Sequence, residues 1–190
     1  MQKARREGFR SRAVYKLEEL DQRDRLLKPG ISIVDLGAAP GGWCQYIERR
    51  LGDRARIVAT DVLPMDPVSG TNFTFVQGDF REPEVLARIE AAVGEARVDL
   101  VLSDMAPNIS GVDVADQAGS VYLAELALEF AKARLKPGGV FVTKLFQGEG
   151  FDDFLKTLRQ AFAKVVLRKP KASRPRSREI YLVARGLRVV

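Results

Sequence analysis

Histidine is absent from this 190-residue sequence, and cysteine occurs only once, as Cys44. Without histidine, neither a Ser-His-Asp triad nor a Cys-His pair can be built. A single cysteine cannot form a disulfide within the chain, and a Cys/His zinc site is excluded as well. We therefore expect no metal centre, and any acid–base chemistry must rely on Asp, Glu, Lys or Tyr side chains.

Long hydrophobic runs are also missing, because the longest apolar stretches have the length of a strand and carry charges nearby. They predict neither a transmembrane helix nor a secretory signal. We expect a cytoplasmic monomer that does not enter a membrane. With 46% hydrophobic residues, a chain of this length can bury one sizeable core. One domain over 1–190 is expected, with a basic, loop-like segment (1–12) leading into a helix.

Positive charge is in excess, with 31 Lys and Arg against 25 Asp and Glu and a formal net charge of +6. This balance favours a polyanionic partner, with nucleic acid ahead of an acidic membrane surface. The alternative is a basic surface that is simply solvated. Two basic clusters stand out: one near the start (Lys3, Arg5, Arg6, Arg10, Arg12) and one near the end (Arg168, Lys169, Lys171, Arg174, Arg176, Arg178).

Short apolar runs alternate with helical patterns along most of the chain. Seven runs indicate strands, and three longer patterns indicate helices, the first of them with Ser11 as its N-cap. The alternation predicts an α/β fold with a mainly parallel sheet and helices on both faces. The expected strands are 33–36, 57–62, 73–76, 98–102, 140–146, 165–168 and 180–184, and the expected helices are 11–27, 121–135 and 152–162.

The tetrapeptide Leu-Lys-Pro-Gly occurs twice, at 27–30 and at 135–138. Each copy lies between a helical pattern and a strand. Proline and glycine just after a helix end it and turn the chain. We interpret the two copies as the same local turn rather than as a sequence repeat.

A glycine-containing turn follows the first strand and extends from Asp35 to Trp43. Glycines between a first strand and its helix let the backbone approach a ligand closely. The spacing is not that of a dinucleotide-binding Gly-x-Gly-x-x-Gly, and Pro40 lies inside the turn. A P-loop is excluded because no Gly-Lys-Ser/Thr follows. The turn indicates a cofactor of another kind.

Three acidic residues, Asp61, Asp79 and Asp104, follow or end successive strands. The carboxyl ends of parallel strands meet in the crevice where such sheets bind ligands. Each aspartate alone would more often be a helix cap or a turn residue. Together they predict a site for an adenosyl group, with Asp61 on the ribose, Asp79 on the adenine amino group and Asp104 near the sulfonium.

Two lysines and a glutamate complete the candidate site. Lys144 interrupts an apolar strand, where a charged side chain is costly unless it is paired or functional. Glu179 begins the last strand, and Lys16 lies in the first helix. The alternatives are a solvated helix face for Lys16 and an ordinary ion pair with Arg176 or Arg178 for Glu179.

Five separated blocks make the sequence similar to the FtsJ/RrmJ-type ribose 2′-O-methyltransferases of large-subunit ribosomal RNA. The resemblance implies a Rossmann-like, seven-stranded sheet with an antiparallel final strand and S-adenosyl-L-methionine as the cofactor. It implies a uridine in the peptidyl-transferase region as the target, on the assembled subunit. Members usually carry a longer basic arm, and a shorter one is expected to weaken RNA binding without altering the fold. The blocks are 11–17 (SRAVYKL), 35–43 (DLGAAPGGW), 103–108 (SDMAPN), 144–150 (KLFQGEG) and 176–181 (RSREIY).

The resemblance also implies roles for individual residues. The expected catalytic residues are Lys16, Asp104, Lys144 and Glu179, and the expected cofactor contacts are Gly41, Trp43, Asp61, Asp79 and Asp104. Lys144 could deprotonate the 2′-hydroxyl, or it could remain cationic and position that oxygen, since a free lysine titrates near pH ~10.4.

Three rival functions stay open at this point. The substrate could be tRNA or an mRNA cap. The chain could also methylate a small molecule, which the basic clusters disfavour, or it could be a non-catalytic RNA-binding assembly factor.

Overall fold

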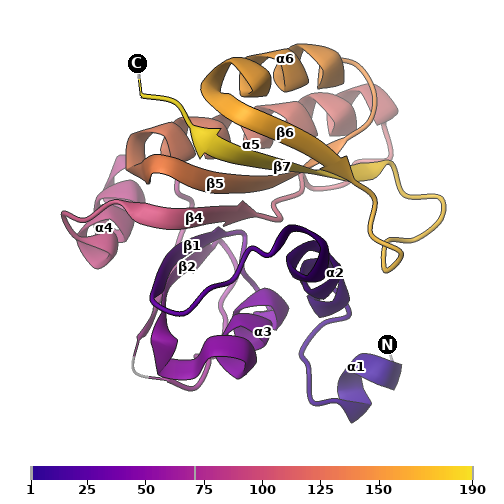
Figure 1. The fold of residues 1–190 in the computed structure, drawn as a ribbon. Coiled ribbons are helices and arrows are strands. Elements are labelled where there is room, and N and C mark those ends of the chain that lie inside the picture. Colours follow the sequence, from indigo (N-terminus) through magenta and orange to yellow (C-terminus); the bar gives the residue numbers. More distant parts are fainter. Residues whose placement is uncertain (1, 71, 190) are drawn as a thin grey trace.

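Residues 2–70 and 72–189 are described by a computed structural model, and their strands form one seven-stranded sheet in the order β3-β2-β1-β4-β5-β7-β6 (Figure 1). The strands are β1 (Ile31–Leu36), β2 (Ala55–Asp61), β3 (Phe73–Gln77), β4 (Val98–Ser103), β5 (Leu135–Phe146), β6 (Phe162–Arg168) and β7 (Glu179–Leu187). The helices are α1 (Gln2–Arg6), α2 (Val14–Asp24), α3 (Gly42–Leu51), α4 (Pro83–Val93), α5 (Asp113–Arg134) and α6 (Phe151–Ala161), and η1 (Gly52–Arg54) is a short 3-10 helix.

The pairing of the strands confirms the predicted fold class. β1 to β5 pair in parallel, whereas β7 is antiparallel to both β5 and β6. Strand β7 therefore starts at the edge of the sheet where β4 and β5 end. All seven strands were expected from the sequence, with boundaries that differ by a few residues.

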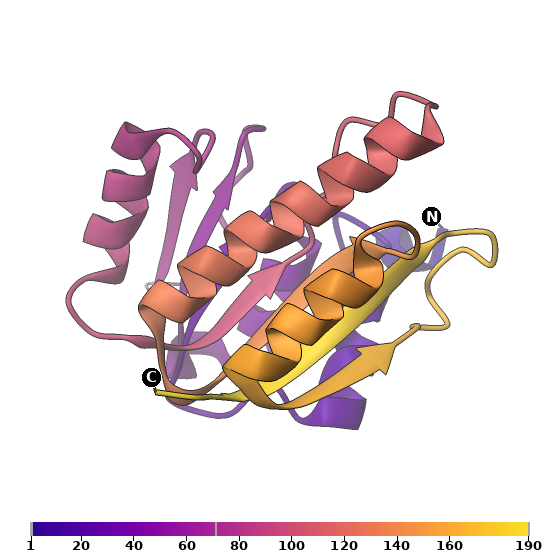
Figure 2. The ribbon, with the colours of Figure 1, turned by 90° about the horizontal axis from the view of Figure 1, so that it is seen from above.

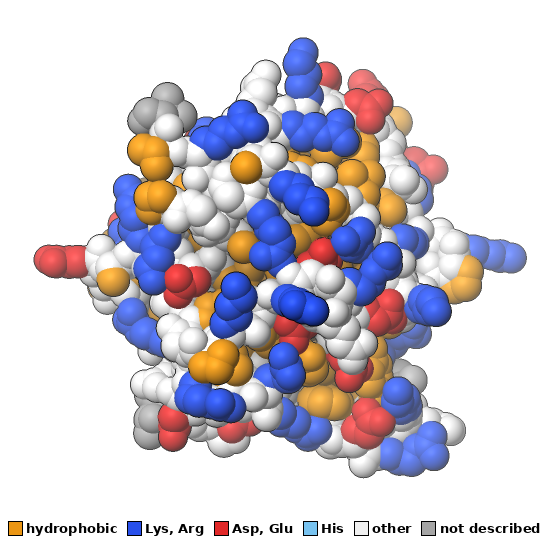
Figure 3. Space-filling model, viewed as in Figure 1, with side chains coloured by type: hydrophobic (Ala, Val, Ile, Leu, Met, Phe, Trp, Pro, Cys, Tyr) orange, Lys and Arg blue, Asp and Glu red, His pale blue; other side chains and the backbone are white. Residues whose placement is uncertain are grey.

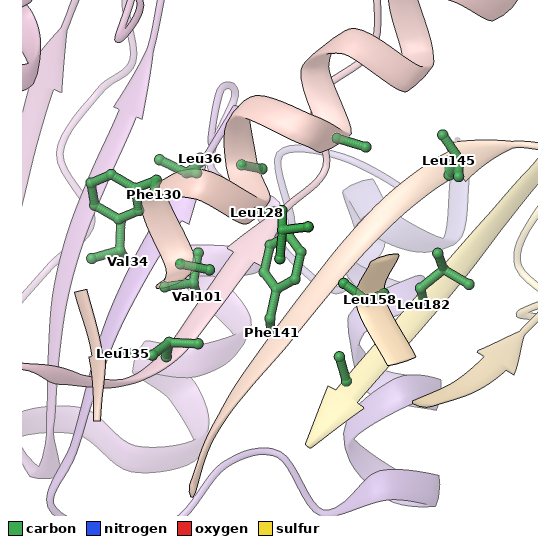
Figure 4. Packing of buried hydrophobic residues seen from close by; sticks show 14 of the residues in the cluster. Val34, Leu36, Val101, Leu128, Phe130, Leu135, Phe141, Leu145, Leu158 and Leu182 are labelled. Carbon is green, nitrogen blue, oxygen red and sulfur yellow. The ribbon is translucent and has the colours of Figure 1, made fainter. Parts of the chain in front are cut away.

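Helices cover both faces of the sheet and create two hydrophobic cores. One core joins the sheet to α4, α5 and α6, which cross the same face (Figure 2). Within it, Phe141 of β5 lies close to Leu128 of α5 and to Val101 of β4 (Figure 4). The other core joins the opposite face to α2 and α3. Because both faces of the sheet are covered, its central strands are nearly continuous apolar runs.

The amino-terminal helices differ from expectation. Residues 2–6 form α1 rather than a loop, since Ala4 is buried and most of the segment consists of good helix formers. Helix α2 begins at Val14, with Ala13 rather than Ser11 at its N-cap position. The Ser11 Oγ accepts a hydrogen bond from the backbone N–H of Ala13 in the turn just before the helix. The same helix ends at Asp24, earlier than expected.

Helix α5 begins at Asp113, eight residues before the expected start at 121. Its first turns are polar and show no apolar periodicity, which hid them from the sequence pattern. Asp116 ties these first turns to the preceding loop. Its carboxylate accepts hydrogen bonds from the backbone N–H groups of Ser110 and Gly111 and from the Ser110 hydroxyl. None of the helices in residues 2–70 and 72–189 is long and apolar enough to cross a bilayer.

A buried carboxyl group lies between the sheet and α3. Asp35 of β1 is 1% exposed, and its Oδ2 accepts a hydrogen bond of 3.2 Å from the Cys44 thiol. Its Oδ1 has no hydrogen-bond partner among the described residues. Burial in this apolar surrounding raises the pKa of Asp35 to about 7. The group is therefore half protonated near neutral pH.

Replacing Asp35 by Asn should stabilise the fold above neutral pH. The raised pKa means that the folded chain binds a proton that the unfolded chain releases between about pH 4 and pH 7, so this carboxyl destabilises the fold increasingly over that range. At pH 8 the free energy of unfolding of Asp35→Asn should exceed that of the wild type by about 4 kcal/mol, because the pKa of Asp35 is raised by about 3 and each pKa unit corresponds to about 1.4 kcal/mol. Denaturant titrations at several pH values measure the difference, which should vanish towards pH 4.

Asp99→Asn serves as the matched control. Burial would raise the pKa of Asp99, but hydrogen bonds from Lys136 and from the backbone N–H of Ser32 hold it below its usual value. This variant should be less stable than the wild type at pH 8. An Asp35→Asn protein that also lost stability at pH 8 would contradict the assignment.

Candidate active site

A cleft of about 610 Å³ opens at the carboxyl ends of the parallel strands. Asp61, Asp79 and Asp104 all line it, and each comes from the end of a different strand. Residues of the 35–43 turn, Gly37 and Ala39, form another part of its wall. The structure thus brings together the three acidic residues that the sequence placed at strand ends.

Asp61 ties the glycine turn to the second strand. Its Oδ2 accepts a hydrogen bond of 2.9 Å from the backbone N–H of Ala39, and its Oδ1 accepts one of 2.9 Å from Leu63 N–H. Because each carboxylate oxygen can accept more than one hydrogen bond, both can still receive a hydroxyl from the cleft.

Asp79 lies in the same cleft but is paired with Arg81, which the sequence reasoning did not anticipate. The Arg81 Nε lies 2.9 Å from both carboxylate oxygens, and Nη2 lies 2.5 Å from Oδ2. These hydrogen bonds hold the pKa of Asp79 below its usual value. Asp79 is therefore a carboxylate at neutral pH, and a ligand amino group would share it with Arg81.

Gly41 and Trp43 lie on the other side of the turn. Gly41 precedes α3 with a φ of 107°, and a Cβ there would come within 2.8 Å of Arg10 Nη1 and 3.0 Å of Met65 Sδ. Trp43 is 3% exposed and donates its indole N–H to the carbonyl oxygen of Ala13. The tryptophan lines a small recess of about 20 Å³ that shares Gly37 and Asp104 with the cleft.

The four expected catalytic residues form two lysine–carboxylate pairs. Lys16 Nζ lies 2.6 Å from Glu179 Oε1, so α2 is joined to the start of β7. Lys144 Nζ lies 3.3 Å from Asp104 Oδ1 and donates a hydrogen bond of 3.1 Å to the Asp104 main-chain oxygen. The Lys144 side chain is only 9% exposed. In solvent-poor surroundings such pairs are held more firmly than pairs on the surface.

Tyr181 is a site residue that the sequence reasoning missed. It is fully buried, stands opposite Lys144 in the β5–β7 register, and donates a 2.5 Å hydrogen bond to Asp104 Oδ1. The same Asp104 oxygen thus faces both the tyrosine hydroxyl and the lysine. The sequence did contain a signal for Tyr181. Side chains alternate between the two faces along a strand, so Tyr181, two positions after Glu179, points to the same face as Glu179.

Glu179 is held as a carboxylate by its neighbours. Burial alone would raise its pKa, but the hydrogen bond and charge of Lys16, a hydrogen bond from the Ser173 hydroxyl and the charge of Lys144 hold it below the usual value. Lys169 fixes the backbone beside it by donating hydrogen bonds to the main-chain oxygens of Ser177 (2.7 Å) and Glu179 (2.5 Å). The alternative considered for Glu179, an ion pair with Arg176 or Arg178, is not found among the described residues; Arg178 pairs with Asp113 instead.

The two basic clusters lie beside the site, as the positions of α1, α2 and the segment before β7 show in Figure 1. Lys and Arg side chains are spread over this face of the molecule (Figure 3). Several of them support the fold. Arg10 donates to the carbonyl oxygens of Pro40, Asp66 and Pro67, and Arg168 forms a two-bond pair with Asp24.

Groups of three or more His, Cys, Asp or Glu side chains that could hold a metal ion do not occur in the described residues. The cleft offers hydrogen-bond acceptors of the kind that hydroxyl and amino groups of a nucleoside need. It offers a carboxylate with free acceptor capacity (Asp61), a second one at the next strand end (Asp79) and a tight glycine turn in its wall.

Comparison with known proteins gives concordant results. The family model described as FtsJ-like methyltransferase matches residues 9–187. Ribosomal RNA large subunit methyltransferase E of Azoarcus sp. (strain BH72) is 58% identical over 188 residues, which cover 99% of this chain and 91% of that protein. The protein of the same name from Marinobacter nauticus is 57% identical over 189 residues, covering 100% and 90%.

Solved structures agree with this relationship. The crystal structure of a Plasmodium falciparum protein described as a ribosomal RNA methyltransferase matches with a TM-score of 0.79 and 32% identity, over 94% of this chain and 98% of that one. Human methyltransferase-like protein 13, solved in complex with SAH, matches with a TM-score of 0.60 at 19% identity over 92% of this chain and 80% of that one, and shows the fold alone. Together the matched length and identity confirm the resemblance first drawn from five sequence blocks: the chain belongs to the FtsJ-like methyltransferase family.

Proposed function

We propose that this protein transfers a methyl group from S-adenosyl-L-methionine to the 2′-hydroxyl of a ribose, that of a uridine, in large-subunit ribosomal RNA. One observation carries the proposal: Asp104 both lines the cleft and pairs with Lys144, whose charge in turn acts on Glu179 of the Lys16–Glu179 pair. The names of the relatives support the substrate, and the excess of basic residues is consistent with it. We further propose that the substrate is the assembled subunit in the cytoplasm, and that the enzyme acts as a monomer.

We propose that Asp61 binds the ribose of the cofactor and that Asp79 binds its adenine. The remaining part of the cofactor is proposed to contact Gly41, Trp43 and Asp104. Bound S-adenosyl-L-methionine would supply an electrophilic methyl group at its sulfonium. The carboxylate of Asp104 would stand at the boundary between cofactor and substrate, because it lines both the cleft and the recess beside Trp43.

The positively charged Lys144 is proposed to hold the oxygen of the ribose 2′-hydroxyl, which accepts the methyl group. Two oxygens of Asp104 lie within reach of its ammonium group, and a lysine ammonium has three N–H donors. The third donor remains for the ribose hydroxyl. Of the two roles considered from the sequence, this geometry favours positioning over deprotonation, since the ammonium group already contacts two oxygens of Asp104. The hydroxyl proton would then leave to water as the oxygen takes up the methyl group. Positioning alone can contribute a large share of a rate enhancement.

Lys16 and Glu179 are proposed to place the ribose. Both side chains are less than one-fifth exposed, and they face each other at 2.6 Å. A hydroxyl of the substrate could donate to Glu179 and accept from Lys16. Tyr181 would act through Asp104, whose Oδ1 it occupies, and we therefore propose it as a positioning residue.

Replacing Lys144 by Ala should abolish methyl transfer, with at least a thousandfold loss of kcat, because the acceptor oxygen loses its positioning group. The dissociation constant of S-adenosyl-L-methionine should change less than threefold, as measured by calorimetry. Lys132→Ala is the matched control, since Lys132 is a surface lysine of α5 whose ion pair is with the exposed Glu129 of the same helix. Retained turnover in Lys144→Ala would refute the assignment.

Binding to ribosomal RNA should weaken steeply with salt. If the unpaired cations of the two basic clusters contact phosphates, each contact contributes roughly 0.7 to 0.9 to the slope of log K against log salt concentration. Titrations between about 50 and 200 mM KCl measure that slope. A small-molecule methyltransferase would show activity that moderate salt leaves unchanged.

The substrate is tested by methyl incorporation into ribosomal subunits, free ribosomal RNA and tRNA, assayed side by side with the wild-type protein. Preferred labelling of the large subunit is the expected result. Preferred labelling of tRNA would contradict the proposed ribosomal RNA substrate but not the proposed methyl transfer. Absence of cofactor binding by calorimetry would instead identify a non-catalytic RNA-binding protein.

A further inference from the structure

The two Leu-Lys-Pro-Gly turns meet in space, although more than a hundred residues separate them in the sequence. Together they line a pocket of about 330 Å³ between the starts of β1 and β5, which flank β4 in the sheet. In the first turn, the Ile31 N–H donates to the Lys28 carbonyl oxygen, and Gly30 has a φ of 84°. Gly138 of the second turn has a φ of 78°. Proline followed by a glycine with positive φ is typical of a type II turn.

The side chains of this amino-end pocket are mostly basic. Its charged lining consists of Arg25, Lys28, Lys136, Arg185 and a single carboxylate, Asp99. Four positive charges against one negative charge leave a net charge of +3 around the cavity. Like charges gathered around one concave site create a positive potential that attracts anions.

Asp99 does not neutralise the remaining cations, because its single negative charge is already matched by that of Lys136. Its Oδ1 lies 2.9 Å from Lys136 Nζ, and its Oδ2 accepts a 2.9 Å hydrogen bond from the Ser32 N–H. Asp99 thereby links Lys136 of the second turn to β1, the strand that follows the first turn. The carboxylate has a structural role and leaves three positive charges uncompensated.

The side chains of Arg25, Lys28 and Arg185 have no ion pair or hydrogen bond with any residue that the structure describes. Other arginines at the same end of the sheet behave differently. Arg56 donates to the main-chain oxygen of Val93, and Arg97 donates to that of Leu135. The pocket therefore holds three cations that the fold itself does not use.

We propose that the amino-end pocket binds a backbone phosphate of the RNA substrate, as a second contact remote from the reacting ribose. The inference rests on the proposed function, in that it takes RNA as the substrate. Phosphate suits the site because Arg and Lys side chains bind its oxygens through charge-assisted hydrogen bonds. The phosphodiester is also the group that every segment of an RNA presents on its surface.

The pocket and the candidate active site lie at opposite ends of the same strand. Asp99 and Asp104 are five residues apart along β4 and its carboxyl end, which corresponds to roughly 17 Å of extended chain. Helices cover both faces of the sheet, so one RNA can reach both sites only along the outside of the molecule. The contact therefore requires an RNA that folds around the protein, and it selects a structured substrate over a short oligonucleotide.

The test compares two variants of matched composition. Arg25→Gln/Lys28→Gln removes one arginine and one lysine from the pocket, and Lys156→Gln/Arg159→Gln removes the same pair from the exposed face of α6. Binding to large ribosomal subunits is titrated as a function of KCl. The pocket variant should lose about tenfold in affinity, and its salt slope should fall by about 1 to 2. The α6 variant should change less than twofold.

Two further measurements separate the possible outcomes. Calorimetry with tripolyphosphate should detect binding to the wild type and not to the pocket variant, while the affinity for S-adenosyl-L-methionine stays unchanged in both. Equal loss of RNA affinity in the two variants, or loss in neither, overturns the proposal. Loss of tripolyphosphate binding with unchanged RNA affinity also overturns it, and identifies a small phosphate ligand instead. If the pocket variant weakens RNA binding but the wild type transfers no methyl group, this inference holds and the proposed function is contradicted.

Discussion

The antiparallel pairing of β7 with β5 determines which side chains can meet at the candidate active site. Parallel strands deliver only their carboxyl ends to the ligand-binding edge of a sheet, and here those ends supply Asp61 and Asp104. An antiparallel strand delivers its beginning to the same edge. The register that places Tyr181 opposite Lys144 and Glu179 opposite Phe146 therefore brings residues from the end of the chain beside residues from its middle. A register shift of one residue would turn both Glu179 and Tyr181 to the other face of the sheet.

Buried charge at this edge is stable only because it is paired. The side chains of Lys144 and Glu179 are only 9% and 11% exposed, and burying either charge without a partner would be costly. Each is matched by an opposite charge, and hydrogen bonds from Ser173 and Tyr181 satisfy further acceptor positions. Removing one member of a buried pair leaves the other uncompensated, which is why single substitutions there act on both stability and chemistry.

The sequence predicted the sheet well because strand signals are local: apolar runs, glycine turns and strand-end acids can be recognised within a few residues. Helix starts were predicted less well, since the polar beginning of α5 is ordered by Asp116, a contact that apolar periodicity does not reveal. The partners of the site residues were hardest to predict. Arg81 on Asp79 and Tyr181 on Asp104 depend on side-chain directions that the sequence leaves undetermined, although strand alternation limits the choice for Tyr181.

Net charge alone overestimates the number of cations that are free to meet RNA. In the two basic clusters, Arg10 and Arg168 are engaged in holding the chain together, and Lys169 fixes the backbone at Glu179. Electrostatic attraction at a distance depends on the total charge, but a close phosphate contact requires a side chain without a competing acceptor. Residues that the fold leaves unpaired are therefore the better guide to where a polyanion is held, and they include cations at the end of the sheet far from the reacting groups.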